Sequence, residues 1–169
     1  MDWQRKGFLE KQFTSKEQTI ILAAENPFEM VWLFWSMKES AYKVWVQQYE
    51  KQKFSPLQFE CKLTSTDDGI VFHQSETYYT TSIIDGYYIF TIATLEKEDK
   101  VFSQIGSPHQ LEVNLKKKLE ELTGYSASEI EKKKTETGVP NYYHENKQIM
   151  IPCSISHHGN YGAFSLFGI

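Results

Sequence analysis

Residues 35–43 read WSMKESAYK, and they lie within a longer segment, residues 26–49, that decides the fold. This segment contains no glycine, and its proline stands directly after Asn26, which is the favoured place for proline at the start of a helix. Apolar residues recur within it at intervals of three and four, as on the buried face of an α-helix. These residues are Met30, Val31, Phe34, Met37, Ala41, Val44 and Trp45. The pattern predicts one long, largely buried helix from Pro27 to about Tyr49.

Two shorter helices are predicted upstream of this segment. Residues 3–12 show a short amphipathic pattern, with apolar residues among charges. Thr14 is followed three residues later by Glu17, which fits a capping box, since the hydroxyl caps the backbone N–H of the glutamate and the glutamate returns to the cap. We therefore expect a second helix that opens at Thr14 and ends at about Glu25.

Downstream of the long helix the pattern changes to that of β-strands. Apolar and polar residues alternate in residues 58–64, and turn signals occur at residues 67–69 and at Asp85-Gly86. The predicted strands are residues 58–64, 70–73, 78–84 and 87–95. Consecutive strands joined by short turns form an antiparallel meander, here one that is rich in aromatic residues.

The last third of the chain begins with another helix. Ser107-Pro108 is a cap followed by a first-turn proline, and Gly124 is a typical helix end. The apolar face of this helix consists of Leu111, Leu115, Leu119 and Leu122. A further capping box at residues 126–129 predicts a short helix that ends near residues 132–134. Strands are predicted at residues 149–155 and 161–167.

These elements define the fold class as α+β, with an antiparallel sheet packed against the long helix. We expect a single domain over residues 1–169, and two closely packed halves within it are an open alternative.

The composition is that of a folded protein. The chain has 169 residues, 40% hydrophobic and 15% aromatic, and no apolar run reaches the ~18 residues of a membrane-spanning helix. The net charge is −4 and only one basic residue is an arginine, which argues against a general nucleic-acid binder. Cys61 and Cys153 are not spaced as metal ligands, so we expect buried free thiols. The start of the sequence has no signal-peptide pattern, so we expect a cytoplasmic protein.

Lys38, Glu39 and Lys43 stand out because they are charged residues in an otherwise apolar helix. Glu39 and Lys43 are four residues apart and therefore lie on one face. One interpretation is an ordinary ion pair on the helix surface. The other, favoured by the many aromatic residues nearby, is a charged site at the rim of a cleft, where the carboxylate binds a hard cation such as Mg²⁺ and the lysine binds phosphate.

Residues 154–161, SISHHGNY, form the second segment of interest. His157 and His158 are adjacent in a strand-like stretch and so point to opposite faces, which argues against a zinc site that uses both. Either a strand ends and turns here, or a Ser-His pair donates to a phosphate. The three lysines at residues 132–134 similarly fit either a solvated helix end or a second phosphate contact.

Four segments together resemble the 4′-phosphopantetheinyl transferases, and the resemblance implies their α+β fold. Residues 35–43 resemble the family signature W-S-x-K-E-(S/A)-x-x-K, and residues 13–17, FTSKE, resemble the F-T-x-x-E that precedes it. Residues 138–140, GVP, resemble the G-K-P element, and residues 154–157, SISH, resemble the S-x-S-H strand. The order of these elements is that of holo-acyl-carrier-protein synthases, whereas the meander is closer to the larger, surfactin-synthetase type.

The resemblance implies an enzyme that moves the phosphopantetheine arm of coenzyme A onto a serine of an acyl or peptidyl carrier protein. The by-product is adenosine 3′,5′-bisphosphate. By their match to the signature, Glu39 is a Mg²⁺ ligand, Lys43 contacts phosphate, and Lys38 sits by the carboxylate cluster. Either Glu39 or a metal-held water takes the serine proton.

The resemblance also assigns residues in the last third of the chain. Ser156 and His157 match a contact to a coenzyme A phosphate. Gly138 and Pro140 match the adenine-side loop, in which Val139 replaces the usual lysine. The lysines that would supply the missing charge are Lys132, Lys133 and Lys134.

One departure concerns the metal. The family carries an early G-x-D or G-N-D on its first strand, whose aspartate is the other principal metal ligand, and this chain has no such element upstream of Phe13. We expect this strand to be missing from the chain and metal affinity to be poor. The alternative function is therefore a catalytically impaired homologue that binds coenzyme A and carrier protein without the full metal site.

The implied partner is an acidic carrier protein. The candidates for a basic face that docks it are Arg5, Lys6 and Lys11, with Phe8 as an apolar neighbour. An ordinary solvated face is the alternative. The carrier can belong to fatty acid biosynthesis or to secondary metabolism, and the family includes both trimers and monomers.

Overall fold

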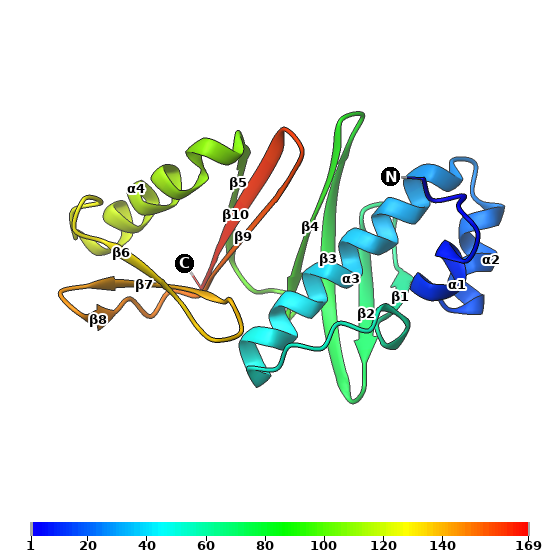
Figure 1. The fold of residues 1–169 in the computed structure, drawn as a ribbon, viewed down its shortest axis with the longest axis horizontal. Coiled ribbons are helices and arrows are strands. Elements are labelled where there is room, and N and C mark those ends of the chain that lie inside the picture. Colours follow the sequence, from blue (N-terminus) through cyan, green and yellow to red (C-terminus); the bar gives the residue numbers. More distant parts are fainter. Residues whose placement is uncertain (1, 169) are drawn as a thin grey trace. The chain divides into compact units, whose positions relative to one another are not determined.

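In the computed structural model, which describes residues 2–168, the chain divides into two compact units with their boundary between Lys97 and Glu98 (Figure 1). Among the described residues, the first unit combines three α-helices with one sheet, and the second combines one α-helix with two small sheets. The chain is thus α+β, as predicted.

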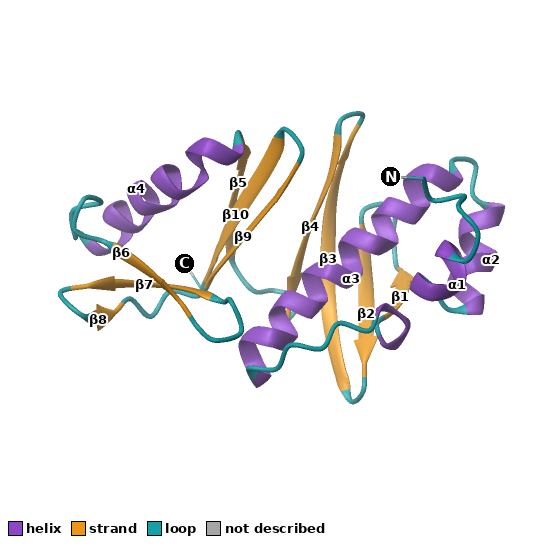
Figure 2. Ribbon diagram, viewed as in Figure 1, coloured by secondary structure: helices purple, strands orange, loops and turns teal. Residues whose placement is uncertain are grey.

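The first unit is a helix-on-sheet structure. Its elements are α1 (Phe8–Gln12), α2 (Ser15–Ala23), α3 (Pro27–Tyr49), η1 (Pro56–Gln58), β1 (Glu60–Leu63), β2 (Asp68–His73), β3 (Glu76–Asp85) and β4 (Tyr88–Thr94). The strands pair antiparallel in the order β1-β2-β3-β4, and α3 packs across one face of the sheet (Figure 2). The predicted meander and long helix are confirmed, and the strand ends differ from the predicted ones by at most two residues.

α3 begins where the sequence predicts, because its start is encoded locally. The Asn26 side chain accepts a hydrogen bond from the N–H of Glu29 at 3.2 Å, and Pro27 occupies the first turn. The buried residues of α3 are Val31, Leu33, Phe34, Met37, Lys38, Ala41, Trp45 and Val46. Met30 and Val44, which were predicted on the buried face, are only partly buried.

Gly69 of β2 lies close against α3. A Cβ atom at this position would lie 2.5 Å from Cε of Met37 and 2.9 Å from the carbonyl oxygen of Lys62. Only glycine fits without displacing one of these atoms. The absence of a side chain at Gly69 therefore sets how deeply α3 sits on the sheet.

The predicted capping box at the start of α2 is confirmed. The Thr14 hydroxyl accepts from the N–H of Glu17 at 3.3 Å, and the N–H of Thr14 donates to Glu17 Oε2 at 2.7 Å. α2 ends at Ala23, two residues before the predicted end. The first predicted helix is shorter than expected, because Gly7 has a left-handed conformation (φ 77°) and α1 starts only at Phe8.

The second unit has a helix packed on small sheets. Its elements are β5 (Val101–Gly106), η2 (Pro108–Gln110), α4 (Leu111–Thr123), β6 (Glu131–Lys134), β7 (Pro140–His144), β8 (Lys147–Gln148), β9 (Cys153–His158) and β10 (Tyr161–Phe167). One sheet has the order β5-β10-β9 and the other β6-β7-β8, and all pairs are antiparallel.

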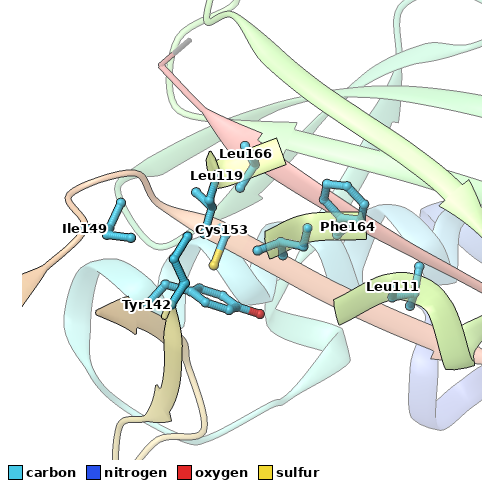
Figure 3. Close-up of a cluster of buried hydrophobic side chains, with 9 residues drawn as sticks. Leu111, Leu119, Tyr142, Ile149, Cys153, Phe164 and Leu166 are labelled. Carbon is cyan, nitrogen blue, oxygen red and sulfur yellow. The ribbon is translucent and has the colours of Figure 1, made fainter. Parts of the chain in front are cut away.

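A cluster of buried side chains joins α4 to both sheets of this unit (Figure 3). It contains Leu111, Leu115, Leu119, Ile130, Tyr142, Ile149, Cys153, Phe164 and Leu166. The predicted helix and its end at Gly124 are confirmed. Leu122, which was predicted on the same apolar face, is instead 39% exposed, so the buried face is narrower than expected.

The predicted short helix at residues 126–134 is wrong. The N–H of Glu129 donates to the backbone carbonyl of Ser126 at 2.9 Å, and the Ser126 hydroxyl lies 2.8 Å from that of Ser128. The segment therefore turns instead of starting a helix, and residues 131–134 form the strand β6, paired with β7. The predicted strand at residues 149–155 begins instead at Cys153 and runs to His158, while β5, β7 and β8 were not predicted.

Cys61 and Cys153 are free and buried, as predicted. None of the helices in the described range has the length and apolar character that crossing a membrane requires.

Candidate active site

Glu39 and Lys43 lie one turn apart on the side of α3 that faces away from the sheet. An α-helix rotates about 100° per residue, so Glu39 lies roughly opposite the buried Met37 and Ala41. Both charged side chains are half-buried rather than fully exposed. The expected placement of the pair on one face is confirmed by the continuous helix.

The two charges change each other's protonation. Burial raises the pKa of the Glu39 carboxyl, and the Lys43 ammonium opposes this shift. Burial lowers the pKa of Lys43, and the Glu39 carboxylate opposes that shift in turn. Partial removal from water thus makes each charge costly alone and favours the simultaneous presence of both.

Aromatic side chains line the surroundings of Glu39. Trp35 and Tyr42 both contact Phe54 from the segment that follows α3, with ring centroids 5.7 Å and 4.7 Å apart. Burial, and then the negative charge of Glu39, raises the pKa of the Tyr42 hydroxyl. The desolvation of Glu39 and its interaction with Tyr42 show that this part of α3 is not a fully solvated helix face.

The residue after Glu39 anchors α3 to the edge strand β4. The Ser40 hydroxyl donates to the backbone carbonyl of Thr91 at 2.7 Å, and the Thr91 hydroxyl lies 2.9 Å from the hydroxyl of Ser82 on β3. This polar contact ties α3 to β4 on the side opposite to Lys38.

Lys38 lies inside the first unit rather than on its surface. Its ammonium is 2.8 Å from Glu17 Oε2, and the two side chains are 0% and 1% exposed. The sequence marks both residues through the resemblance but contains no sign that they pair, since 21 positions separate them. The signal that could have indicated the pairing is a lysine on the apolar face of a helix, which requires a buried acceptor.

The candidates from the second unit lie in β9 and in the β6–β7 hairpin. Ser156 pairs with Ala163 of β10 and His157 pairs with Gly162, so the two side chains project from opposite faces of the strand. His157 is exposed and Ser156 is half-buried. Gly162 and His157 are paired across the two strands, so both face the same side of the sheet. Gly162 lies against Leu111 of α4, so this is the side on which α4 packs.

The β6–β7 hairpin brings Lys134, Gly138 and Pro140 together. Lys134 is directly opposite Pro140 in the register, and the N–H of Gly138 donates to the Thr135 carbonyl at 2.9 Å. Gly138 has φ 80°, a left-handed conformation that closes this turn and favours glycine.

The neighbouring lysines are engaged within the second unit. Lys132 contacts Glu112 at 2.9 Å, and Lys133 lies 3.6 Å from Glu131. Lys134 is exposed, on a strand instead of the predicted helix end. The three lysines thus lie on the edge strand β6, where two of them form ion pairs with glutamates of the same unit.

One of the basic residues near α1 lies over a buried aromatic ring. Arg5, Lys6 and Lys11 are all exposed, and the Arg5 guanidinium lies 5.2 Å from the ring centre of Phe8. Phe8 itself is only 4% exposed, so it supports this surface from below and does not itself form an apolar patch on it.

Glu39 can serve as one ligand of a metal ion. Mg²⁺ is commonly held by one or two carboxylates together with substrate phosphates and water. No group of three or more His, Cys, Asp or Glu side chains with metal-binding geometry occurs within residues 2–168. The described residues therefore do not form a metal cage of their own, and Glu39 could supply one carboxylate ligand to an ion whose other ligands come from elsewhere.

The first unit is thus an α+β structure whose long helix carries a carboxylate and an ammonium group one turn apart on one face. A family model described as the 4′-phosphopantetheinyl transferase superfamily matches residues 1–93, which is more than half of the chain. The chain belongs to the 4′-phosphopantetheinyl transferase superfamily. The matched range includes Glu39 and Lys43 and ends before the second unit. Neither the curated proteins nor the solved structures contain a match.

Proposed function

We propose that this protein transfers the 4′-phosphopantetheine group of coenzyme A to a serine hydroxyl of an acyl or peptidyl carrier protein. The observation that carries the proposal is the half-buried pair Glu39–Lys43 on the outward side of α3, in a chain of this superfamily. A carboxylate and an ammonium ion at this spacing suit a diphosphate that is bound together with a divalent cation.

In the proposed reaction the serine oxygen attacks the phosphorus that carries the pantetheine arm. The bond from this phosphorus to the bridging oxygen of the diphosphate breaks, and adenosine 3′,5′-bisphosphate leaves. Glu39 would hold a Mg²⁺ ion, which would neutralise the diphosphate charge. Lys43 contacts a phosphate oxygen, and the serine proton passes to Glu39 or to a water beside it.

Residues of the second unit are proposed to hold the nucleotide part of coenzyme A. Ser156 and His157 are the candidates for a phosphate contact, and Gly138, Pro140 and Lys134 for the adenine side. Because Ser156 and His157 project from opposite faces of β9, one of them can face a given phosphate directly. Single substitutions of each will therefore separate their contributions to coenzyme A affinity.

The exposed cluster Arg5, Lys6 and Lys11 is the proposed docking surface for the acidic carrier. Opposite charge on the two partners accelerates their encounter and orients it. We further propose that the protein acts in the cytoplasm, which agrees with its two free buried thiols.

The test is a transfer assay with the chain, coenzyme A, Mg²⁺ and an apo carrier protein, read by mass spectrometry. The carrier should gain the mass of one phosphopantetheine group. A fatty-acid carrier and a peptidyl carrier, tested side by side, identify the substrate. Glu39→Gln should abolish the gain, whereas Glu29→Gln, an exposed glutamate in the first turn of the same helix, should not. No gain with either carrier rejects the activity for this chain.

A second candidate function is binding of coenzyme A and carrier without transfer. It is favoured by the single carboxylate at the site, since residues 2–168 contain no metal-binding cluster. Under this alternative, calorimetry would show coenzyme A binding with the same affinity with and without Mg²⁺, and the transfer assay would show no product.

A further inference from the structure

The Lys38–Glu17 pair is the most deeply buried charged feature of the first unit. The two side chains are 0% and 1% exposed, and the Lys38 ammonium lies 2.8 Å from Glu17 Oε2. The ammonium also donates to the carbonyl oxygen of Pro56 at 2.9 Å and lies 5.3 Å from the ring centre of Phe13. The Lys38 side chain is therefore held by two separate segments of the chain, residues 13–17 and Pro56.

The Glu17 carboxylate is also held by hydrogen bonds from the backbone. Its Oε2 atom accepts from the N–H of Thr14 at 2.7 Å, and its Oε1 atom accepts from the N–H of Cys61 at 2.7 Å. One carboxylate thus connects the start of α2, the first strand of the sheet and, through Lys38, the middle of α3. Both of its oxygens are engaged, so the carboxylate has little freedom to move.

A buried ion pair contributes little net free energy to the stability of a fold. Removing two charges from water costs several kcal/mol for each ion, and well-packed apolar residues of similar volume are often as stable. A buried pair can, however, define one arrangement of its elements, because each partner must meet specific acceptors and donors. Here those partners determine the rotation of α3 about its own axis.

The neighbour of Lys38 in the chain is the residue on which the proposed chemistry depends. Consecutive side chains on an α-helix diverge by about 100°, so a Lys38 that is held inward directs Glu39 outward. Lys43 follows one turn later on the same face as Glu39. Any rotation of α3 would change the directions of Glu39 and Lys43 together.

We propose that Glu17 and Lys38 are positioning residues, which lock α3 so that Glu39 and Lys43 face the substrates, and that Lys38 itself does not touch substrate. This inference rests on the proposed function and replaces the role at the carboxylate cluster that the family resemblance implies for Lys38. A positioning residue of this kind is inaccessible to reagents and affects kcat through the orientation of α3, whereas a catalytic group contacts the substrate.

The first test measures access to Lys38 by reductive methylation of the native chain, read by peptide mass spectrometry. Lys38 should resist methylation with and without coenzyme A, and it should react only after unfolding. Lys51 and Lys53, which are exposed, serve as internal controls. A Lys38 that reacts as fast as these controls, or that coenzyme A protects, overturns the inference.

The second test compares Glu17→Gln, Lys38→Met and the double variant. Each single variant leaves one buried charge without its partner and should lower the thermal midpoint by about 10 °C. The double variant removes both charges and should recover at least half of that loss. Its kcat for transfer should nevertheless stay about tenfold or more below wild type, with the KM for coenzyme A within about threefold, because misorientation affects the reacting geometry more than binding.

Tyr49→Phe is the matched control for the second test. It removes a 2.6 Å hydrogen bond to Glu76 that is exposed, at the far end of the same helix. Its kcat and thermal midpoint should stay close to wild type. If the double variant also has wild-type kcat, the pair only packs the interior and the positioning role is overturned. The inference is also overturned if the loss of thermal midpoint in the double variant equals the sum of the losses in the two single variants, because the effects of two interacting residues are not additive.

A third readout is independent of turnover. In the two-dimensional amide NMR spectrum of the double variant, the signals of Glu39 and Lys43 should shift, as a rotated α3 requires. Unchanged signals at these two residues overturn the positioning role. If the wild-type chain transfers no phosphopantetheine, the proposed function fails on its own, while the methylation and amide results still decide whether Lys38 and Glu17 form the lock.

Discussion

Lys38 and Glu39 are consecutive residues of α3, yet their charges lie in opposite environments. The Lys38 ammonium is fully buried and forms an ion pair with Glu17. Glu39 is only half-buried, on another face of the helix that it shares with Lys43. A single step along the helix, a rotation of about 100°, thus separates a fully buried charge from a half-buried one.

Glu39→Gln should remove activity without destabilising the protein. The carboxylate is desolvated, so its replacement by a neutral amide should leave the thermal midpoint unchanged or slightly higher. Transfer to the carrier should fall by about 100-fold or more, because the amide is a poor Mg²⁺ ligand and a poor base. Differential scanning fluorimetry and the mass assay, run on the same sample, check both parts. A variant that keeps wild-type transfer removes Glu39 from the proposed reaction.

Activity should depend on pH on both sides of neutrality. Burial raises the pKa of Glu39 above its usual 4.5, so the carboxylate protonates, and activity falls, at a higher pH than for an ordinary glutamate. Burial lowers the pKa of Lys43 below its usual 10.5, so its charge is lost earlier as pH rises. The profile of kcat/KM against pH should therefore be bell-shaped, and Lys43→Met should flatten its alkaline limb.

The same shift has a defined effect on stability. Because the pKa of Glu39 is higher in the folded state than in the unfolded chain, the folded state binds more protons between the two values. The contribution of this group to the free energy of unfolding therefore falls as pH rises through the window above 4.5. Urea unfolding of wild type and Glu39→Gln, at several pH values from acid to neutral, should show the variant gaining relative stability as pH rises. The opposite slope would contradict the assigned environment.

The basic surface near α1 should affect the carrier and not coenzyme A. Substituting Arg5, Lys6 and Lys11 by alanine should raise the KM for an acidic carrier about fivefold or more at low ionic strength, with the KM for coenzyme A unchanged. Added salt should reduce the difference, since it screens exposed charges. The control is the Lys51→Ala/Lys53→Ala variant, which removes exposed lysines after α3. If both variants raised the KM for the carrier equally, the carrier would respond only to the overall charge of the protein and not to the surface near α1.

Gly69→Ala should destabilise the first unit through a clash. The new Cβ would lie 2.5 Å from Met37 Cε and 2.9 Å from a backbone oxygen, and the backbone has little room to yield. We expect a loss of about 1–3 kcal/mol in the free energy of unfolding, measured with urea. Gly86→Ala is the matched control, because a Cβ there meets no atom within 4 Å. Equal stability of the two variants would mean that α3 does not sit as closely on β2 as described.

Tyr142→Phe should leave the second unit as stable as before, or stabilise it by up to about 1 kcal/mol. The Tyr142 hydroxyl is buried without a hydrogen-bond partner in the apolar cluster of Figure 3, so its removal avoids a desolvation penalty. Tyr78→Phe provides the contrast, because its hydroxyl donates to Gln48 at 3.2 Å and its loss should be destabilising. Chemical unfolding of the two variants compares them directly.

Much of the first unit follows from local sequence signals. The Asn26-Pro27 start, the Thr14–Glu17 capping box and the spacing of apolar residues predict α2 and α3 within a few residues, because caps and helix faces depend on neighbours within one or two turns. Alternation and turn residues predict the meander for the same reason. The proximity of Glu39 and Lys43 is also a local property, since four residues make about one turn.

What only the tertiary structure decided depends on pairing between distant segments. The strand β6 forms because residues 131–134 find β7 as a partner, although their own residues favoured a helix end. The burial of Lys38 against Glu17 likewise depends on α2 packing on α3. The sequence by itself determined where α2 and α3 begin, which of their residues share a face and which family signature they carry. Which of the signature charges face the interior was decided by long-range contacts, because a charge can be buried only where the fold supplies its partners.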